Sequence, residues 1–159
     1  MKQDMCVSCG DGIVNIRAGA IIMKDGKLLM VGNDRDDYLY SVGGRIKFGE
    51  TAEEAIVREV LEETGVQMEI DRLGFVQENY FFAEAPENRG KLFYEISFYF
   101  YMKVPENFVP ISESFTEDQH KEYLRWVSLD EEIRMYPIFF RTELQNPIEA
   151  VKVFVKDER

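Results

Sequence analysis

The sequence predicts one α/β domain in which a mixed β-sheet lies between α-helices. Several segments have strand length and strand pattern, the most extended being Lys91 to Lys103. One amphipathic segment, Thr51 to Thr64, has helical periodicity and lies between strand-forming segments. No repeat, low-complexity tract or linker divides the 159 residues. We therefore expect a single domain over residues 1–159, with residues 1–12 as an N-terminal tail.

Composition limits the classes of function. Hydrophobic residues make up 45% of the chain, which is enough for a folded core. The formal net charge is −11 and no block of Lys and Arg occurs, so we expect no nucleic-acid polymer as partner. No apolar run is long enough to span a membrane, and no signal-peptide pattern occurs, so we expect no membrane partner and a cytoplasmic location.

The first strands precede the helix. Ile13 to Ile22 alternates and then becomes continuously apolar, which predicts a strand entering a core. Lys24 to Lys27 has the chemistry of a hairpin turn, so Leu28 to Val31 is expected to return as a second strand. Tyr38 to Val42 then leads into a glycine pair.

The helix has a signal at each end. Thr51 is a suitable N-cap, and Glu54 stands three residues later, which is the spacing of a capping box. Gly65 can adopt the left-handed conformation that ends a helix. At about 100° per residue, one apolar side is formed by Ala52, Ala55, Ile56 and Val60.

Acidic residues share part of that apolar side. Glu59 and Glu63 fall within its arc and Glu62 lies at its edge, at spacings that bring side chains together. Carboxylates gathered there repel one another and lose hydration, so a cation is expected among them. Arg58 can neutralise the charge of one carboxylate through an i,i+4 pair with Glu62. The remaining negative charge indicates a divalent metal, and Mg²⁺ and Mn²⁺ prefer such oxygen ligands.

The alternative is an ordinary solvated acidic face. We assign that role to Glu53 and Glu54, which lie on the outer side of the helix.

These residues form a longer pattern. Gly44, five residues, Glu50, seven residues, and then Arg58 to Val66 (REVLEETGV) agree with the Nudix box at every defined position. The chain therefore resembles the Nudix hydrolases over Gly44 to Val66. The resemblance implies the Nudix fold and hydrolysis of a diphosphate linked to another moiety, with Mg²⁺ or Mn²⁺.

The resemblance also implies roles for single residues. Glu59, Glu62 and Glu63 would bind metal and act in catalysis, while Arg58 would orient the carboxylates. Glu59 is the candidate for deprotonating the attacking water. By position, the carbonyl of Gly43 would reach the metal.

Further acids stay open. Glu50 is a second-line metal ligand or a structural acid. Some Nudix enzymes take their base from a later loop, so Glu113, Glu117 and Glu122 remain alternatives to Glu59. The single histidine, His120, is not favoured for this role.

The second half predicts more strands. Met68 to Phe82 contains two strand segments, and Tyr123 to Ser128 is another. In Lys91 to Lys103 the faces alternate, and Glu95 is either solvent-facing or directed to a cleft.

The C-terminal part predicts two short helices and a strand. Ser128 and Glu131 have capping-box spacing for a helix over Leu129 to Met135. Pro137 is expected to open a second helical stretch, which has Phe139, Phe140 and Leu144 on its apolar side. Val151 to Val155 closes the sheet as an edge strand.

Cys6 and Cys9 form a C-x-x-C pair in the predicted tail. A closed zinc site needs four ligands, and one distant histidine cannot supply the other two. We expect two thiols without a metal, or else a zinc site shared across a dimer.

The substrate is less closely defined. A nucleoside triphosphate or a related nucleotide is favoured, as a small molecule. ADP-ribose and dinucleoside polyphosphates remain alternative substrates. Nudix enzymes that act on ADP-ribose tend to have a proline shortly after the box, but here the first proline is Pro86. Enzymes that act on dinucleoside polyphosphates tend to have a tyrosine in that region, and Tyr80 is only roughly at its position. A Nudix-fold nucleotide-binding or regulatory module without turnover is the other alternative, and a homodimer is left open.

Overall fold

The computed structural model describes residues 2–110, 113–115 and 121–159. Two α-helices occur in these residues, α1 (Ala52–Thr64) and α2 (Phe140–Glu143), with a 3₁₀ turn at Pro86–Asn88. The strands are β1 (Cys6–Cys9), β2 (Gly12–Ile21), β3 (Met23–Lys24), β4 (Lys27–Asn33), β5 (Leu39–Arg45), β6 (Glu69–Phe82), β7 (Leu92–Lys103), β8 (Glu113–Phe115), β9 (Lys121–Ser128), β10 (Met135–Tyr136) and β11 (Lys152–Asp157).

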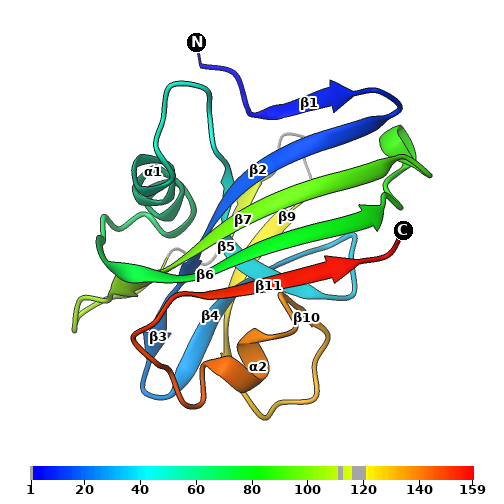
Figure 1. Cartoon of the computed structure of the whole chain (residues 1–159). Coiled ribbons are helices and arrows are strands. Elements are labelled where there is room, and N and C mark those ends of the chain that lie inside the picture. Colours follow the sequence, from blue (N-terminus) through cyan, green and yellow to red (C-terminus); the bar gives the residue numbers. More distant parts are fainter. Residues whose placement is uncertain (1, 111–112, 116–120) are drawn as a thin grey trace.

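The strands form one mixed sheet in the order β11-β6-β7-β2-β5-β4-β9-β8, with β1 beside β2, β10 beside β5 and β3 beside β4. β2 and β7 are parallel, from Ile13 opposite Phe93 to Ile21 opposite Tyr101. β5 joins the two halves because it pairs with β2 on one side and β4 on the other (Figure 1). The predicted α/β architecture with a mixed sheet is confirmed.

The first hairpin follows from its turn residues. Asp25 and Gly26 both have positive φ, 51° and 76°, as a two-residue hairpin turn requires. Met23 therefore pairs with Leu28 and begins the β3–β4 ladder. The predicted turn and returning strand are confirmed.

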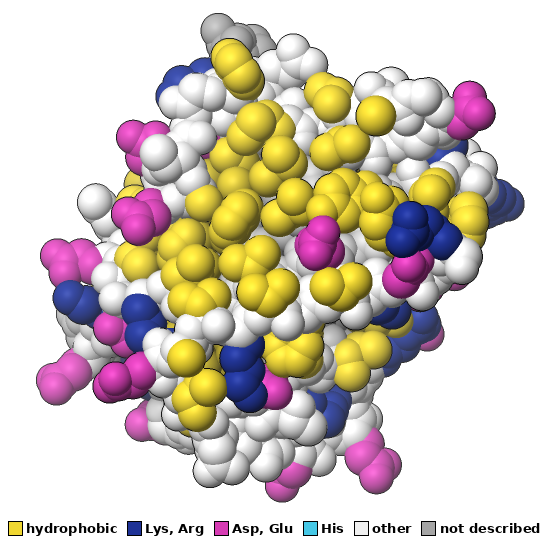
Figure 2. Space-filling model, in the orientation of Figure 1, with side chains coloured by type: hydrophobic (Ala, Val, Ile, Leu, Met, Phe, Trp, Pro, Cys, Tyr) yellow, Lys and Arg dark blue, Asp and Glu magenta, His cyan; other side chains and the backbone are white. Residues whose placement is uncertain are grey.

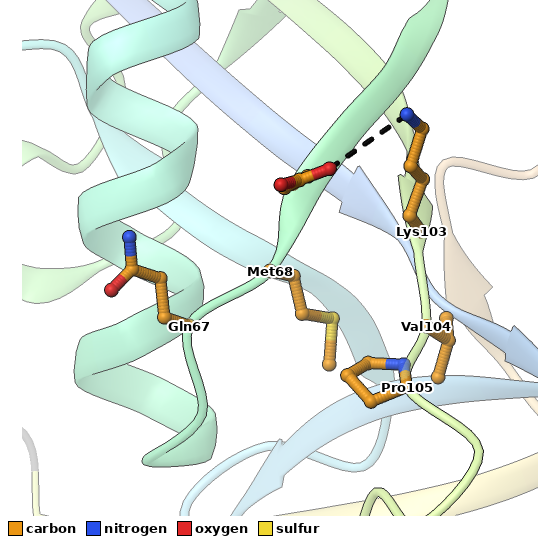
Figure 3. Close-up of a pocket in the computed structure, with 6 residues that line it drawn as sticks. Gln67, Met68, Lys103, Val104 and Pro105 are labelled. Atoms are coloured by element: carbon orange, nitrogen blue, oxygen red, sulfur yellow. Dashed lines mark ion pairs between the residues drawn. The ribbon is translucent and has the colours of Figure 1, made fainter.

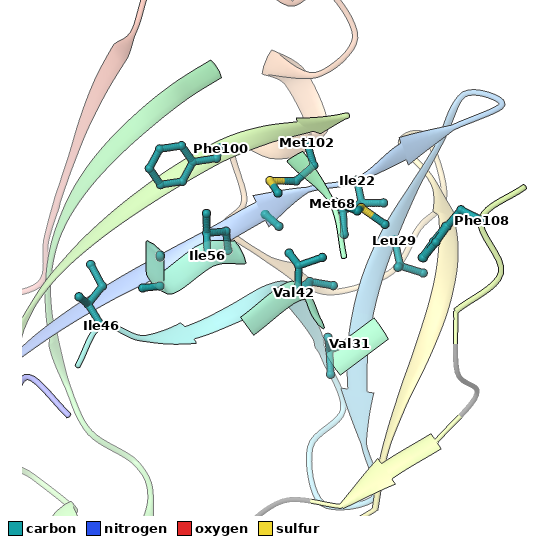
Figure 4. Packing of buried hydrophobic residues seen from close by; sticks show 14 residues of the cluster. Ile22, Leu29, Val31, Val42, Ile46, Ile56, Met68, Phe100, Met102 and Phe108 are labelled. Atoms are coloured by element: carbon teal, nitrogen blue, oxygen red, sulfur yellow. The ribbon is translucent and has the colours of Figure 1, made fainter. Parts of the chain in front are cut away.

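Helix α1 has the predicted ends. Thr51 accepts a hydrogen bond from the backbone N–H of Glu54, whose side chain accepts one from the backbone N–H of Thr51. Gly65 closes the helix with φ of 75°. Its buried side packs on the main core (Figure 4), which includes Ile22, Leu29, Val42, Ile56, Val60, Phe100 and Met102.

A second core lies on the opposite face of the sheet, beneath α2. Phe140 is fully buried and packs on Phe75 and Tyr99, with ring centroids 6.2 and 5.1 Å away. Phe139 stacks on Phe154 of β11 at 4.3 Å. The helical stretch after Pro137 is thus present, although α2 itself has only four residues.

The predicted N-terminal tail is wrong for its second half. β1 pairs with β2 in antiparallel register, from Cys6 opposite Asn15 to Cys9 opposite Gly12. The backbone of Met5 also bonds to the carbonyl of Ile46 at 2.8 Å. The segment is ordered because its backbone groups complete the edge of β2.

The predicted helix over Leu129–Met135 is also wrong. Arg141 donates to the carbonyls of Leu129, Glu131 and Ile133 at 3.0, 2.5 and 2.6 Å. Those carbonyls are therefore engaged by a side chain from α2, and Glu131 pairs with Arg125 instead of capping a helix.

The two segments predicted over Met68 to Phe82 are one strand, β6. Its pairing with β7 shifts register between Ile70 and Arg72 and again between Leu73 and Phe75. Such bulges interrupt the alternation, which explains why the sequence pattern divides there.

Candidate active site

Three carboxylates surround Arg58. Its Nε and Nη2 donate to the two oxygens of Glu50 at 2.7 and 3.0 Å, and its Nη1 donates to Glu59 at 2.6 Å and to Glu62 at 3.3 Å. The predicted pair with Glu62 is present but is the longest of the four contacts. The two-point contact with Glu50 is the stronger type of ion pair.

Glu50 is therefore occupied within the protein. Hydrogen bonds from Arg58, with a smaller contribution from the backbone N–H of Lys47, lower the pKa of Glu50 to about 2. Of its two predicted roles, the structure favours the structural one, because both its oxygens face Arg58.

The carboxyl group of Glu59 lies directly against Gly44, which has no side chain. A Cβ added to Gly44 would come within 2.5 Å of the Glu59 carboxyl group, so only glycine permits this approach. Burial raises the pKa of Glu59, and Arg58 partly offsets that rise. Glycine is thus required at position 44 by the nearby Glu59 side chain of α1, and not by the backbone conformation of a turn.

Glu63 is the most desolvated acid of the site. It accepts a hydrogen bond from the backbone N–H of Gly43 at 3.3 Å, and none of the ion pairs among the described residues includes it. Burial, followed by the charges of Glu122 and Glu59, raises its pKa well above the ordinary value.

The structure brings one later acid to this place. Glu122 on β9 accepts a hydrogen bond from the Tyr40 hydroxyl at 3.2 Å and is close enough to affect Glu63. Glu113 is in β8, and its side chain lies outside the described residues, as do Glu117 and His120. Of the three alternatives to Glu59 as the base, Glu122 is the one whose side chain the structure places.

The donor set suits a divalent cation. Within the described part of the chain, no three Asp, Glu, His or Cys side chains already converge around one point. Burial, and after it the negative charges of Glu122 and Glu59, nevertheless raise the pKa of Glu63, so these acids repel one another. A cation there would relieve that repulsion, so these residues fit Mg²⁺ or Mn²⁺.

A row of polar side chains crosses the sheet on the face opposite α1. Asn15, Glu95 and Asn79 stand side by side on β2, β7 and β6. The Asn15 amide donates to Glu95 at 2.8 Å, while the amide oxygens of Asn15 and Asn79 are buried without a hydrogen-bond partner. Buried polar atoms normally have partners, so these oxygens are available to a ligand.

Arg17 stands in the next row and links the two regions. Burial alone would lower its pKa, but the charges of Glu95, Tyr99, Glu63 and Glu59 raise it overall. No ion pair among the described residues includes Arg17. The side chain is thus a cation between the polar row and the box acids.

Sequence reasoning left Glu95 between solvent and cleft, and missed the role of Arg17, Asn15 and Asn79. The structure places Glu95 beside Asn15, half-buried. A signal was present: Asn15 and Arg17 are the polar residues of one face in a strand that is otherwise apolar.

Comparison with known proteins decides the family. A family model, the NUDIX domain, matches residues 14–144, which cover most of the chain. The chain belongs to the NUDIX family.

Individual relatives are more distant. A "MutT-like protein" of Streptomyces ambofaciens is 37% identical over 62 residues, which span 39% of this chain and only 40% of that protein. The solved MutT protein of Bacillus halodurans has a TM-score of 0.61 at 17% identity, covering 88% of this chain and 86% of that chain. An ADP-ribose pyrophosphatase of Streptococcus suis has a TM-score of 0.56 at 18% identity, covering 89% and 98%. At these identities the two structures show the Nudix fold.

A surface hollow of about 340 Å³ lies where β6 begins, directly after the Nudix box in the sequence, and where β7 ends (Figure 3). It contains an exposed ion pair of Lys103 with Glu69 at 3.8 Å, and no residue of the Nudix box lines it. Neither described helix has the length and apolar character needed to cross a bilayer.

Proposed function

We propose that this Nudix protein is a metal-dependent hydrolase that cleaves a phosphoanhydride of a nucleoside diphosphate linked to another moiety. One observation carries the proposal: Glu59 and Glu63 are desolvated acids held against the glycine pair, with Glu122 adding to their repulsion. An arrangement that costs stability in this way is typical of functional sites.

Glu59, Glu62 and Glu63 would hold Mg²⁺ or Mn²⁺, with the Gly43 carbonyl assigned by position in the box. The bound cation would offset phosphate charge and make water more acidic. Arg58 fixes the orientation of Glu59 through its 2.6 Å contact and is itself anchored by Glu50. Arg58 is therefore a positioning residue.

Glu59 is the favoured general base. Burial raises its pKa, which makes it a better proton acceptor than an exposed glutamate. Glu122 is the second candidate because its charge acts on Glu63 and its carboxylate accepts a hydrogen bond from the Tyr40 hydroxyl. Comparing Glu59→Gln with Glu122→Gln separates them: loss of the base lowers kcat and removes the corresponding limb of the pH profile.

The nucleotide would lie on the polar face, with its phosphates toward Arg17. Arg17 is the cation between the box acids and Glu95, and the free amide oxygens of Asn15 and Asn79 would accept hydrogen bonds from the base or sugar. We favour a nucleoside triphosphate or a related nucleotide. The relatives' names mention both MutT and ADP-ribose pyrophosphatase, so ADP-ribose belongs in the same test.

The test is a hydrolysis screen with Mg²⁺ or Mn²⁺ over nucleoside triphosphates, ADP-ribose, nucleotide sugars and dinucleoside polyphosphates, with products resolved by chromatography. We expect metal-dependent cleavage that Glu63→Gln removes and Glu53→Gln, on the exposed side of α1, leaves intact. Tight nucleotide binding without cleavage of any compound would instead support a binding module.

A further inference from the structure

On the sheet face that packs against α1, apolar side chains of β2, β7 and β6 continue beyond the helix. The opposite face carries the polar row of Asn15, Glu95 and Asn79 beside the apolar side chains of Ile13, Phe93 and Phe81. A sheet face that is directed to water usually carries polar side chains instead. In Figure 1, α1 stands beside one end of these strands and leaves their other ends uncovered.

We define the outer sheet face by the apolar residues of those uncovered ends. Its members are Val7, Val14, Ile16, Val76, Tyr80, Phe82, Tyr94, Ile96, Val153 and Val155. Val155 and Val153 are 67% and 64% exposed, and Phe82 and Val7 are 50% and 47% exposed. Figure 2 shows hydrophobic side chains forming one continuous field there, with charged groups mostly at its border.

The acids within this field have hydrogen-bond partners, and one of them is neutralised by an ion pair. Glu78 accepts a hydrogen bond from the Tyr94 hydroxyl at 2.5 Å. Asp157 is held by two donors of the Arg159 guanidinium at 2.9 and 2.7 Å, and that guanidinium lies 4.0 Å above the Tyr80 ring. Glu78 is thus an acid within the face that has no ion pair among the described residues, while Asp157 is neutralised, so the face carries few charges for a chain whose net charge is −11.

The two edges of the face differ in shape. At the β1 edge lies a mainly apolar hollow of about 270 Å³, lined by Met5, Val7, Val14, Ile16 and Phe48 together with the polar residues Gln3 and Asp4. At the opposite edge, β11 presents the exposed side chains of Val153 and Val155. A twofold axis across the face could place each copy's β11 ridge near the other copy's hollow, which is the self-complementary arrangement of a symmetric dimer.

We infer that the outer sheet face binds a second copy of this chain, forming a homodimer by packing sheet on sheet. If a whole side chain from valine to phenylalanine has about 150–200 Å² of accessible surface, the exposed area of the outer sheet face together with Phe48 is roughly 700 Å². This area is close to the ~800 Å² that each partner buries in a standard interface. Because the face carries few charges, two acidic copies would bring few acids together when they meet across it.

The test is sedimentation of the full chain at micromolar concentration, comparing wild type with Val155→Glu. We expect wild type to be a dimer and Val155→Glu a monomer with unchanged far-UV circular dichroism, since residue 155 is exposed within one copy. Val109→Glu is the matched control, because Val109 is 78% exposed but outside the face. It should remain a dimer.

Because Val155 lies in β11, a glutamate there could disturb the strand itself, so a second variant at another strand tests the same face. Phe82→Ser changes another side chain of the face and should also give a folded monomer. A wild-type protein that sediments as a monomer would overturn the inference. The same holds if that monomer co-sediments with neutral phosphatidylcholine vesicles, because the face would then bind lipid instead of a second copy. So would dimers that persist in both Val155→Glu and Phe82→Ser.

Discussion

Arg58 and Glu50 are joined by two hydrogen bonds, Nε to Oε1 at 2.7 Å and Nη2 to Oε2 at 3.0 Å. Eight residues apart in the sequence, they connect the loop before α1 to the middle of that helix. The same guanidinium contacts Glu59 at 2.6 Å. Glu50 therefore acts on the site through the orientation of Arg58.

Glu50→Gln should destabilise the fold at neutral pH by about 1–2 kcal/mol, the scale of a hydrogen bond to a charged group. The folded pKa of Glu50, about 2, is below its ordinary 4.5, so this contribution is present above pH of about 4.5 and is lost as the pH falls toward 2. Urea unfolding across this range should show the wild-type advantage shrinking. An advantage that is constant with pH would contradict the charged pair.

Gly44→Ala should lower kcat strongly, by about 10²-fold or more, because its Cβ would displace the Glu59 carboxyl group. Steady-state kinetics of Gly44→Ala, Glu59→Gln and the double variant provide the check. If alanine acts through Glu59, the double variant should be little worse than Glu59→Gln alone. Fully additive losses would show that Gly44 acts by another route.

Glu63→Gln should raise the stability of the metal-free protein and reduce its stabilisation by metal. The neutral amide can still accept from Gly43, and it removes repulsion from Glu59 and Glu122. We expect the metal-free Tm to rise by about 2–4 °C, as for roughly 1 kcal/mol in a chain of this size.

Millimolar Mn²⁺ should raise the Tm of wild type and raise that of Glu63→Gln much less. Glu53→Gln, outside the site, is the control and should respond like wild type. A Glu63→Gln variant that keeps the full metal shift would remove Glu63 from the proposed ligands.

Arg17→Met should raise KM for the nucleotide about tenfold or more while leaving the Mn²⁺-induced Tm shift nearly unchanged, because Arg17 is assigned to the substrate's phosphates. Arg45→Met is the matched control. Arg45 lies opposite Arg17 in the β2–β5 register, but its side chain is 44% exposed and pairs with Asp4. Equal effects of both variants on KM would indicate a general loss of positive charge.

The sequence by itself determined most of α1 and its neighbourhood. Thr51, Glu54 and Gly65 are local signals, and their hydrogen bonds form within one turn of the chain, so spacing alone predicts them. The same holds for the Asp25–Gly26 hairpin and for β7, whose alternation is long. Periodicity likewise put Glu59 on the side of α1 that meets the sheet.

Only the tertiary structure decided which partners those residues meet. The spacing favoured Glu62 as partner of Arg58, but Glu50 reaches it from the preceding loop, and Arg141 takes the carbonyls that a helix over residues 129–135 would have used. Arg17, Glu122 and Glu63 come together from three elements far apart in the chain. Such contacts depend on strand order and register, which short-range patterns do not encode, because the free energy of each pairing is realised only when distant segments pack.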